Sequence, residues 1–402
     1  MKPVEIKPGI HWVGVVDWNL RNFHGYSQTR YGSTYNAYLL IDDKVTLFDT
    51  VDFKYRQEFL CQINHLVNPK DIDYLVVNHV EPDHSGSLAA IVEEIQPEKI
   101  LTSKMGEQFI QGRFHPEGWP IETVDNEQVV SLGKRSVQFL ETRMLHWPDS
   151  MVSFIPEEKL LISQDAFGQN IASSERFDDH IDWTTLKQEM AHYYANIILP
   201  YSPKVPKAVQ KIQDLGWDID MIAPDHGLIL RKHIGDTIQA YLEFAAQKPT
   251  EKAVIVYDTM WRSTEKMAEV LASGLTEAGI TVKPFHLKSW HHSDVMGEVW
   301  DAGAVLAGSP THNNNIMPLM ADMLTYMKGL KPKNKIGFAF GSYGWSGESP
   351  KIIANWLDEM GMEQVVEPAK IKHVPTHEDY RQLTEAAGTI AQAIKDRVAR
   401  AS

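Results

Sequence analysis

His79-Val80-Glu81-Pro82-Asp83-His84 is the stretch that decides the fold of the first half of the chain. Residues 73–79 have the pattern of a buried strand and residues 85–95 that of a helix, so the stretch lies at a strand's carboxyl end. Open α/β sheets usually place their ligands there. Two imidazoles and two carboxylates within six residues exceed what a turn needs, and they predict a two-metal site. The alternative is a polar loop in which Asp83 caps the next helix.

Three later residues extend this candidate site, namely His146, Asp165 and His226. Each of them, taken alone, is more typical of a structural role. Asp165 and His226, however, each follow an apolar stretch with the pattern of a strand. This pattern predicts that both side chains reach the same sheet edge as His79.

Composition and charge exclude several classes of protein. A length of 402 residues predicts two or three domains, and a net charge of −14 argues against nucleic acid and anionic membranes as partners. No apolar run approaches the roughly 18 residues of a membrane span, and the N-terminus lacks an export signal. The single cysteine excludes internal disulfides and Cys-x-x-Cys sites and fits a cytoplasmic location, so metal ligands would be imidazoles and carboxylates.

We predict two domains, residues 1–249 and residues 250–402. In the first, strands at 35–41 and 45–49 begin a mixed pattern of strands and helices. In the second, strands at 252–258, 281–287, 302–308 and 335–341 alternate with helices at 263–278, 317–330 and 350–360. This alternation predicts a doubly wound parallel sheet. Residues 251–402 carry 16 basic and 18 acidic side chains, so the preceding residues carry 23 and 35, a net charge of −12.

Polar loops follow three of the predicted strands of the second domain. In the first loop, Thr259, Ser263 and Thr264 precede or open a helix whose free backbone N–H groups can bind a phosphate. The loop lacks Gly-Lys-Ser/Thr, which argues against ATP or GTP, and the chain lacks the Gly-x-Gly-x-x-Gly of nicotinamide-binding folds. The other loops are residues 308–315 and 341–348. The alternative is that all three are ordinary turns with packed aromatic side chains.

The histidine and carboxylate pattern of the first domain resembles the diiron site of flavodiiron proteins, whose first domain is a metallo-β-lactamase-like αββα sandwich. In typical hydrolases of that superfamily the second position of the motif is His, which favours zinc. Glu81 instead adds negative charge and oxygen ligation, which suit iron. The resemblance implies two non-haem irons with a carboxylate or oxo bridge, one held by His79, Glu81 and His146, the other by Asp83, His84 and His226, with Asp165 bridging. It also implies catalytic roles for His84 and for Tyr26, whose hydroxyl would donate a hydrogen bond to a metal-bound oxygen.

The three loops of the second domain resemble the phosphate loop and the two isoalloxazine loops of flavodoxins. This resemblance implies a flavodoxin-like domain that binds FMN. Trp261, Tyr343 and Trp345 would flank the flavin ring, and the glycines would let backbone N–H groups approach its polar edge. The candidate FMN-binding residues are Thr259, Met260, Trp261, Ser263, Thr264, Ser309, Pro310, Thr311, Asn313, Asn314, Ser342, Tyr343, Gly344, Trp345 and Gly347.

Together, the two resemblances imply an oxidoreductase that reduces dioxygen to water or nitric oxide to nitrous oxide, with FMN relaying electrons to the diiron site. They imply a separate electron donor such as rubredoxin, and a head-to-tail homodimer or a dimer of such dimers. We expect dioxygen to be preferred. Lys328, Lys331, Lys333 and Lys335 form a basic run on which an acidic redox protein could dock; the alternative is a solvated loop.

Two other functions compete with this interpretation. One is a zinc hydrolase of the metallo-β-lactamase superfamily fused to a flavodoxin-like domain, against which Glu81 argues. The other is a redox or gas sensor without turnover, although no DNA-binding or signalling module is recognisable.

Overall fold

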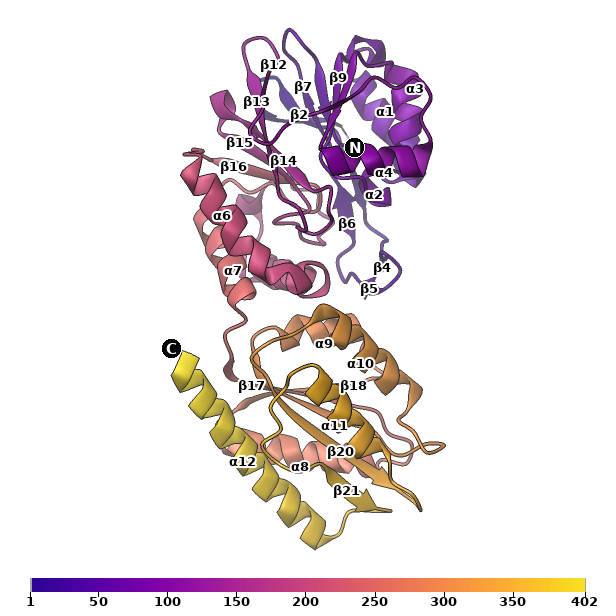
Figure 1. Cartoon of the computed structure of the whole chain (residues 1–402), viewed down its shortest axis with the longest axis vertical. Helices are drawn as coiled ribbons and strands as arrows, with labels where there is room; N and C mark the ends of the chain where they lie inside the picture. The colour runs from indigo at the N-terminus through magenta and orange to yellow at the C-terminus, as the bar shows by residue number, and fades with distance from the viewer. Residues whose placement is uncertain (1, 402) are drawn as a thin grey trace. The chain divides into compact units, whose positions relative to one another are not determined.

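The computed structural model describes residues 2–401 and divides into two compact units, which are described separately (Figure 1). Unit 1 comprises the chain up to Gly25, Thr29–Tyr193 and Pro203–Leu242. Unit 2 comprises Tyr26–Gln28, Tyr194–Ser202 and the chain from Glu243 on. Among the described residues, no helix is both long and apolar enough to span a membrane.

Unit 1 contains two main β-sheets. In spatial order, the seven-stranded sheet consists of β1 (Val4–Lys7), β2 (Ile10–Trp12), β7 (Tyr38–Leu40), β8 (Thr46–Phe48), β9 (Tyr74–Val77), β10 (Lys99–Thr102) and β11 (Ile121–Thr123). The five-stranded sheet consists of β12 (Val129–Ser131), β13 (Ser136–Glu141), β14 (Met151–Ile155), β15 (Leu160–Gln164) and β16 (Met221–Pro224). The remaining short strands of this part of the chain are β3 (Val15–Asp17), β4 (Asn22–Phe23), β5 (Ser27–Gln28) and β6 (Ser33–Tyr35), of which β5 belongs to unit 2.

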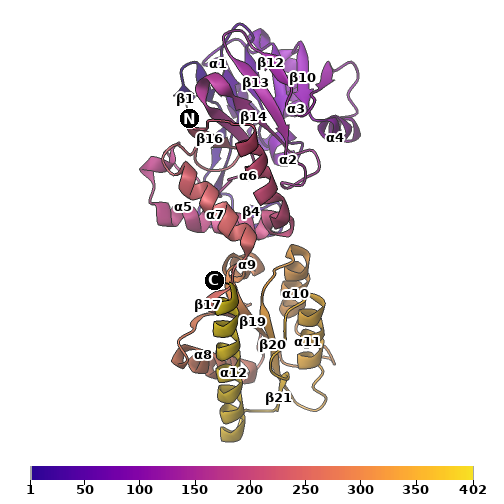
Figure 2. The same ribbon diagram turned by 60° about the vertical axis from the view of Figure 1, so that its left-hand side comes forward.

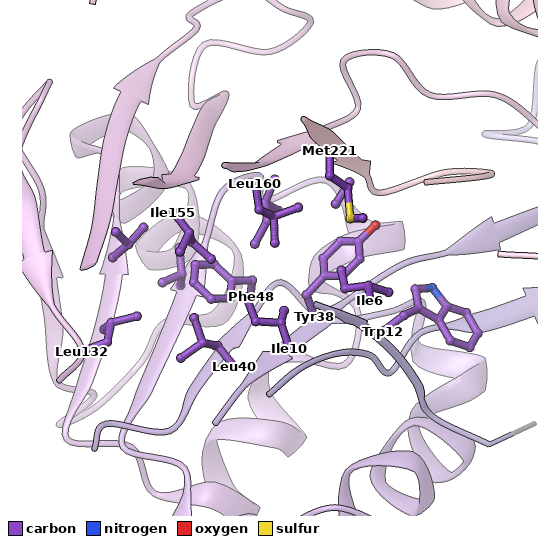
Figure 3. Packing of buried hydrophobic residues seen from close by; sticks show 14 of the residues in the cluster. Ile6, Ile10, Trp12, Tyr38, Leu40, Phe48, Leu132, Ile155, Leu160 and Met221 are labelled. Carbon is purple, nitrogen blue, oxygen red and sulfur yellow. The ribbon is translucent and has the colours of Figure 1, made fainter. Parts of the chain in front are cut away.

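The core of unit 1 lies between these two sheets. Successive side chains of a strand point to opposite faces, and β8 shows the consequence: Phe48 joins the cluster between the sheets (Figure 3), whereas Leu47 joins the cluster under the helices. Every residue of β14, β15 and β16 is buried, as expected for strands that are covered on both faces.

Helices cover the outer faces of both sheets (Figures 1 and 2). The second core cluster contains residues of α1, α3 and α4, which pack on the seven-stranded sheet, while α6 and α7 flank the other sheet. The predicted αββα sandwich is therefore confirmed. The α-helices of this part of the chain are α1 (Arg56–Asn64), α2 (Pro82–Ser85), α3 (Leu88–Ile95), α4 (Lys104–Phe114), α5 (Trp183–Tyr193), α6 (Val205–Asp214) and α7 (Ile234–Ala246).

The prediction of one continuous strand at 35–41 was wrong. The structure has two strands there, β6 and β7, separated by residues 36 and 37. Asn36, at the break, is buried, and its side chain accepts a hydrogen bond from Trp12 Nε1 (2.8 Å) and donates one to the carbonyl of Pro224 (2.7 Å). β6 then pairs with β3, while β7 pairs with β2 and β8. Periodicity did not reveal this break, since the partners of Asn36 are distant in sequence.

Unit 2 contains the predicted doubly wound parallel sheet. Its strands are β17 (Thr250–Tyr257), β18 (Thr281–His286), β19 (Ala302–Gly308), β20 (Ile336–Tyr343) and β21 (Ala369–Lys372). Their spatial order is β18-β17-β19-β20-β21, all parallel, which is the flavodoxin-like order. The helices are α8 (Ser263–Glu277), α9 (His292–Val299), α10 (Pro318–Leu330), α11 (Ser349–Glu359) and α12 (His377–Ala401). Figure 2 shows α8 and α12 on one side of the sheet and α10 and α11 on the other.

Two short segments from the first half of the chain belong to unit 2 by their contacts. In one of them, Asn196 donates a hydrogen bond to the carbonyl of Ser293 (3.2 Å) and accepts one from the Tyr326 hydroxyl (2.7 Å). The units therefore interleave along the sequence. A single boundary at residues 249–250 stays a prediction.

Candidate metal centre and cofactor loops

Four predicted ligands converge on one point of unit 1. His79 and Glu81 come from the loop after β9, His146 from the loop after β13, and Asp165 from the residue after β15. His146 Nε2 lies 3.1 Å from Glu81 Oε2 and 2.9 Å from Asp165 Oδ2, and His79 Nε2 lies 3.2 Å from Glu81 Oε2. One ligand atom from each of the four residues lies within 4.8 Å of the other three, so the four could hold one ion.

A second group forms on the other side of the Asp165 carboxylate. Its members Asp83, His84 and His226 also present ligand atoms within 4.8 Å of one another. Asp165 Oδ1 lies 3.0 Å from His84 Nε2 and 3.3 Å from His226 Nε2, while Asp165 Oδ2 faces the first group. One carboxylate thus faces two clusters with different oxygens, which is the arrangement of a bridging ligand.

Local structure explains why these residues meet. Pro82 opens the short helix α2, and this turn carries Asp83 and His84 away from Glu81. β15 and β16 are parallel neighbours, so Asp165 and His226 leave the sheet at the same edge. The structure brings together all seven residues predicted as metal ligands, and all seven are buried.

Outer hydrogen bonds orient the imidazoles. Asp149 Oδ2 lies 3.1 Å from His79 Nδ1 and also accepts the backbone N–H of Val80 (2.7 Å). The carbonyl of Thr34 accepts a hydrogen bond from His226 Nδ1 (2.7 Å). A proton on each Nδ1 leaves the Nε2 lone pair free to face a metal, the usual arrangement around metal-binding histidines.

The carboxylates and imidazoles of the metal centre shift one another's pKa values. Burial on its own raises the pKa of Asp165, but the imidazoles of His84, His146 and His226 hold that pKa well below its usual range. Burial likewise lowers the pKa of His226, yet the carboxylates of Asp165 and Asp83 raise it to about 9. Carboxylates with low pKa values and imidazoles that carry an exchangeable proton are groups that metal cations bind in exchange for protons. Nitrogen and oxygen donors without thiolate fit iron.

The phosphate loop of unit 2 also has groups available for a ligand. α8 begins after Arg262 without a side-chain hydrogen bond to its first N–H groups. The hydroxyl of Thr259 is buried and has no hydrogen-bond partner among residues 2–401. Thr264 lies 3.0 Å from Ser342 through their hydroxyl oxygens, which joins this loop to the third one. A phosphate bound at the helix N-terminus would satisfy these donors.

The other two loops form one pocket at the ends of β19 and β20, lined by Thr311, Asn313, Asn314, Gly344, Trp345 and Ser346. Trp261 and Trp345 are each 89% exposed, an unusual state for tryptophan that suits a ring bound between aromatic faces. Met260 is also exposed. These features fit a flavin.

Internal contacts shape the same two loops. The Ser309 hydroxyl donates to the carbonyl of Pro310 (2.9 Å), and its oxygen accepts the N–H of Met317 (2.9 Å). Gly347 has φ +83°, and a Cβ there would lie 2.4 Å from Lys370. Lys370 in turn lies over the Tyr343 ring, 4.8 Å from its centroid. The positive φ therefore favours glycine at position 347.

Comparisons with known proteins support the folds assigned to the two units. A family model described as "ODP family beta lactamase" matches residues 34–227, and a flavodoxin model matches residues 255–386. The chain is 54% identical to rubredoxin-oxygen oxidoreductase of Megalodesulfovibrio gigas, over 99% of this chain and 100% of that protein. It is 45% identical to nitric oxide reductase of Moorella thermoacetica, over 98% and 100% of the two chains. The crystal structure of the flavodiiron protein from Giardia intestinalis matches with a TM-score of 0.96 at 31% identity, over 100% and 99%.

The chain belongs to the flavodiiron proteins.

Two site residues of this flavodiiron protein were not identified from its sequence. His24 Nε2 lies 2.8 Å from Asp83 Oδ2, and its Nδ1 lies 3.6 Å from Glu81 Oε1. Asp149 is the other, through its contact with His79. A single histidine or aspartate in a loop gives no signal until its distant partner is known.

Tyr26, predicted to act at the metals, is found in unit 2. Its ring centroid lies 6.1 Å from that of Tyr326, and its carbonyl accepts a hydrogen bond from His292 Nε2 (2.7 Å). Its catalytic role stays a prediction.

The basic run proposed as a docking site requires a correction. Lys335 is only 1% exposed, and its ammonium donates to the carbonyl of Trp300 (2.9 Å), so it cannot contact a partner. Lys328 pairs with Glu359 (2.6 Å). Lys335 directly precedes β20, and its side chain is buried.

Proposed function

We propose that the chain is an oxidoreductase that reduces dioxygen to water or nitric oxide to nitrous oxide at a diiron site, with electrons relayed by FMN. The observation that carries this proposal is that the two oxygens of Asp165 face two histidine and carboxylate clusters, in a chain that also has a flavodoxin-like unit. Two close relatives are named for these two reactions. Those names favour an oxidoreductase over a zinc hydrolase.

The reaction needs electrons and protons from outside. Dioxygen takes up four electrons and four protons to form two waters, and two nitric oxide molecules take up two of each to form nitrous oxide and water. When bound, a pair of irons would supply the electrons that reduce the gas, and FMN would supply the means to relay them from the donor.

The side chains of the metal centre would have distinct tasks. His79, Glu81 and His146 would hold one iron, Asp83, His84 and His226 the other, and Asp165 both. The carboxylates of Glu81, Asp83 and Asp165 would offset the positive charge of bound iron. Asp149 and the carbonyl of Thr34 keep two imidazoles in the orientation for binding. His24 is placed to hold the Asp83 carboxylate by a hydrogen bond.

Unit 2 would hold FMN through its three loops. Thr259, Ser263 and Thr264, with the N–H groups of α8, would bind the phosphate. Trp261, Tyr343 and Trp345 would contact the ring. The pocket residues Thr311, Asn313, Asn314 and Gly344 would approach the polar edge of the ring, and Met260, Ser309, Pro310, Ser342 and Gly347 would shape the loops.

Electrons would come from rubredoxin or another separate donor, since one relative is named for rubredoxin. We also propose a head-to-tail homodimer, in which the FMN of one subunit serves the diiron site of the other, and a cytoplasmic location. Sedimentation equilibrium tests the dimer.

The decisive experiment measures iron, zinc and flavin in the purified protein. Two irons and one FMN per chain are expected, followed by anaerobic stopped-flow oxidation of the reduced enzyme with dioxygen and with nitric oxide. Reduced rubredoxin should then support continuous turnover. Zinc without iron, in protein produced with iron available, would favour the hydrolase. Oxidation of the reduced enzyme without any turnover would favour a sensor.

A further inference from the structure

Unit 1 contains a cavity that none of the seven proposed metal ligands lines. Its volume is about 250 Å³, and it lies between α6 and the end of β13 with the loop that follows. The residues that line it are Asn126, Leu140, Glu141, Thr142, Arg143, Leu145, Lys204, Lys207, Ala208 and Lys211. This size suits a small metabolite rather than a large cofactor.

The cavity concentrates positive charge in an acidic part of the chain. Lys204, Lys207 and Lys211 are spaced three and four residues apart, so they lie along one face of α6. Lys211 pairs with Glu127, and Arg143 with Glu141. Within residues 2–401, neither Lys204 nor Lys207 has a carboxylate partner at ion-pair distance. Two unneutralised ammonium groups at one hollow attract an anion.

Thr142 supplies a second, independent observation. The residue is 7% exposed, and its hydroxyl lacks any hydrogen-bond partner in the described part of the chain. Its backbone N–H is already bound to the carbonyl of Ser150 (2.9 Å), so the end of β13 is fixed in place. A buried hydroxyl without a partner is rare and destabilising. Its oxygen is covered by the protein, so the side chain must rotate about χ1 to present the hydroxyl to a ligand in the cavity.

We propose that this cavity is a binding site for a small organic anion that carries a carboxylate or phosphate group. The ammonium groups of Lys204 and Lys207 bind the anionic group, and the Thr142 side chain rotates about χ1 so that its hydroxyl donates a hydrogen bond to it. Leu140, Leu145 and Ala208 contact its carbon skeleton. Leu145 also precedes His146, so the ligand rests against the loop that presents this side chain to the metals.

Isothermal titration calorimetry of the full chain, loaded with iron and flavin, tests the site with succinate and glycerol 3-phosphate at constant ionic strength. Neither probe is a strong iron chelator. We expect saturable binding of at least one probe at one site per chain, and tighter binding than that of inorganic phosphate. Absence of saturable binding overturns the proposal, as does equal affinity for inorganic phosphate, which would mean that the apolar wall contributes nothing.

Variants then locate the site. Lys207→Gln should weaken binding about tenfold, the effect of losing one charged hydrogen bond, whereas Lys134→Gln makes the same charge change at an exposed position of unit 1 outside the cavity and should leave affinity unchanged. Thr142→Val should weaken binding, while Thr142→Ser, which keeps the hydroxyl, should retain it. Equal losses in Lys207→Gln and Lys134→Gln would overturn the proposal. A second outcome would also overturn it. If Lys207→Gln binds the anions normally and loses only affinity for rubredoxin, the cavity is a docking surface for an acidic protein.

Discussion

The metal centre of unit 1 and the flavin loops of unit 2 are both built at strand ends, but they are prepared to different degrees. The side chains of the metal centre are buried and already point at one another, held by partners such as Asp149. In the flavin loops, Trp261 and Trp345 extend into solvent, and the first turn of α8 has no side-chain cap. The fold thus positions the metal ligands in advance, whereas the flavin itself would complete its own site.

The largest effect is expected at the residue that the two metal clusters share. Asp165→Ala removes ligand atoms from both clusters and leaves the imidazoles without the carboxylate they face. Both irons should be lost. The loss of iron affinity should exceed the roughly 10–100-fold that follows removal of a residue that only hydrogen-bonds to a ligand. Elemental analysis together with circular dichroism checks this. A folded Asp165→Ala protein with two tightly bound irons would show that Asp165 is no bridge.

A change in the phosphate loop should affect only the other unit. Thr264→Leu places a bulky apolar side chain where a buried hydroxyl meets Ser342, so FMN should be lost while iron is retained. The flavin absorbance per iron is the measurement. Thr276→Leu makes the same change at an exposed position of α8 and should keep its flavin. Loss of both cofactors in Thr264→Leu would contradict separate sites.

A smaller effect is expected from a residue that touches no metal. Asp149→Asn replaces the carboxylate that holds His79 Nδ1, and iron affinity should fall by about 10–100-fold. Competition with a chelator measures this affinity. Asp125→Asn, at an exposed position, is the matched control. Equal chelator resistance in the two variants would show that Asp149 does not position His79.

The last effect is confined to the stability of unit 2 and changes no cofactor site. Burial lowers the pKa of Lys335 from 10.5 to about 7, so between these values the unfolded chain binds a proton that the folded chain does not. The contribution of Lys335 to stability therefore rises as the pH rises above 7, by about 2 kcal/mol between pH 7 and pH 9. In Lys335→Met this gain should disappear, whereas the exposed Lys333→Met should keep it. Thermal unfolding of the three proteins at both pH values provides the measurement, and parallel pH curves for wild type and Lys335→Met would contradict the shift.

The sequence predicted most of the fold, because the apolar strands and the alternation of the second half are local patterns. It also predicted seven of the residues that the structure brings together at the metal centre, since four of them stand in one short stretch at a strand end. Asn36, His24 and Asp149 were missed because their importance comes from partners far along the chain, such as Pro224 for Asn36. Lys335 was misjudged because its burial depends on the carbonyl of Trp300.

The interleaving of the two units affects the order in which the chain can fold during its synthesis. Tyr194, Ala195, Ile197 and Ile198 are buried in the finished protein, and the neighbouring Asn196 binds residues that lie 97 and 130 positions later in the chain. At about 5–20 residues per second, a ribosome needs on the order of 5–25 s to produce those partners. During that interval the apolar segment is exposed to solvent without the residues that later cover it. We expect it to be the part of the nascent chain that most needs a chaperone.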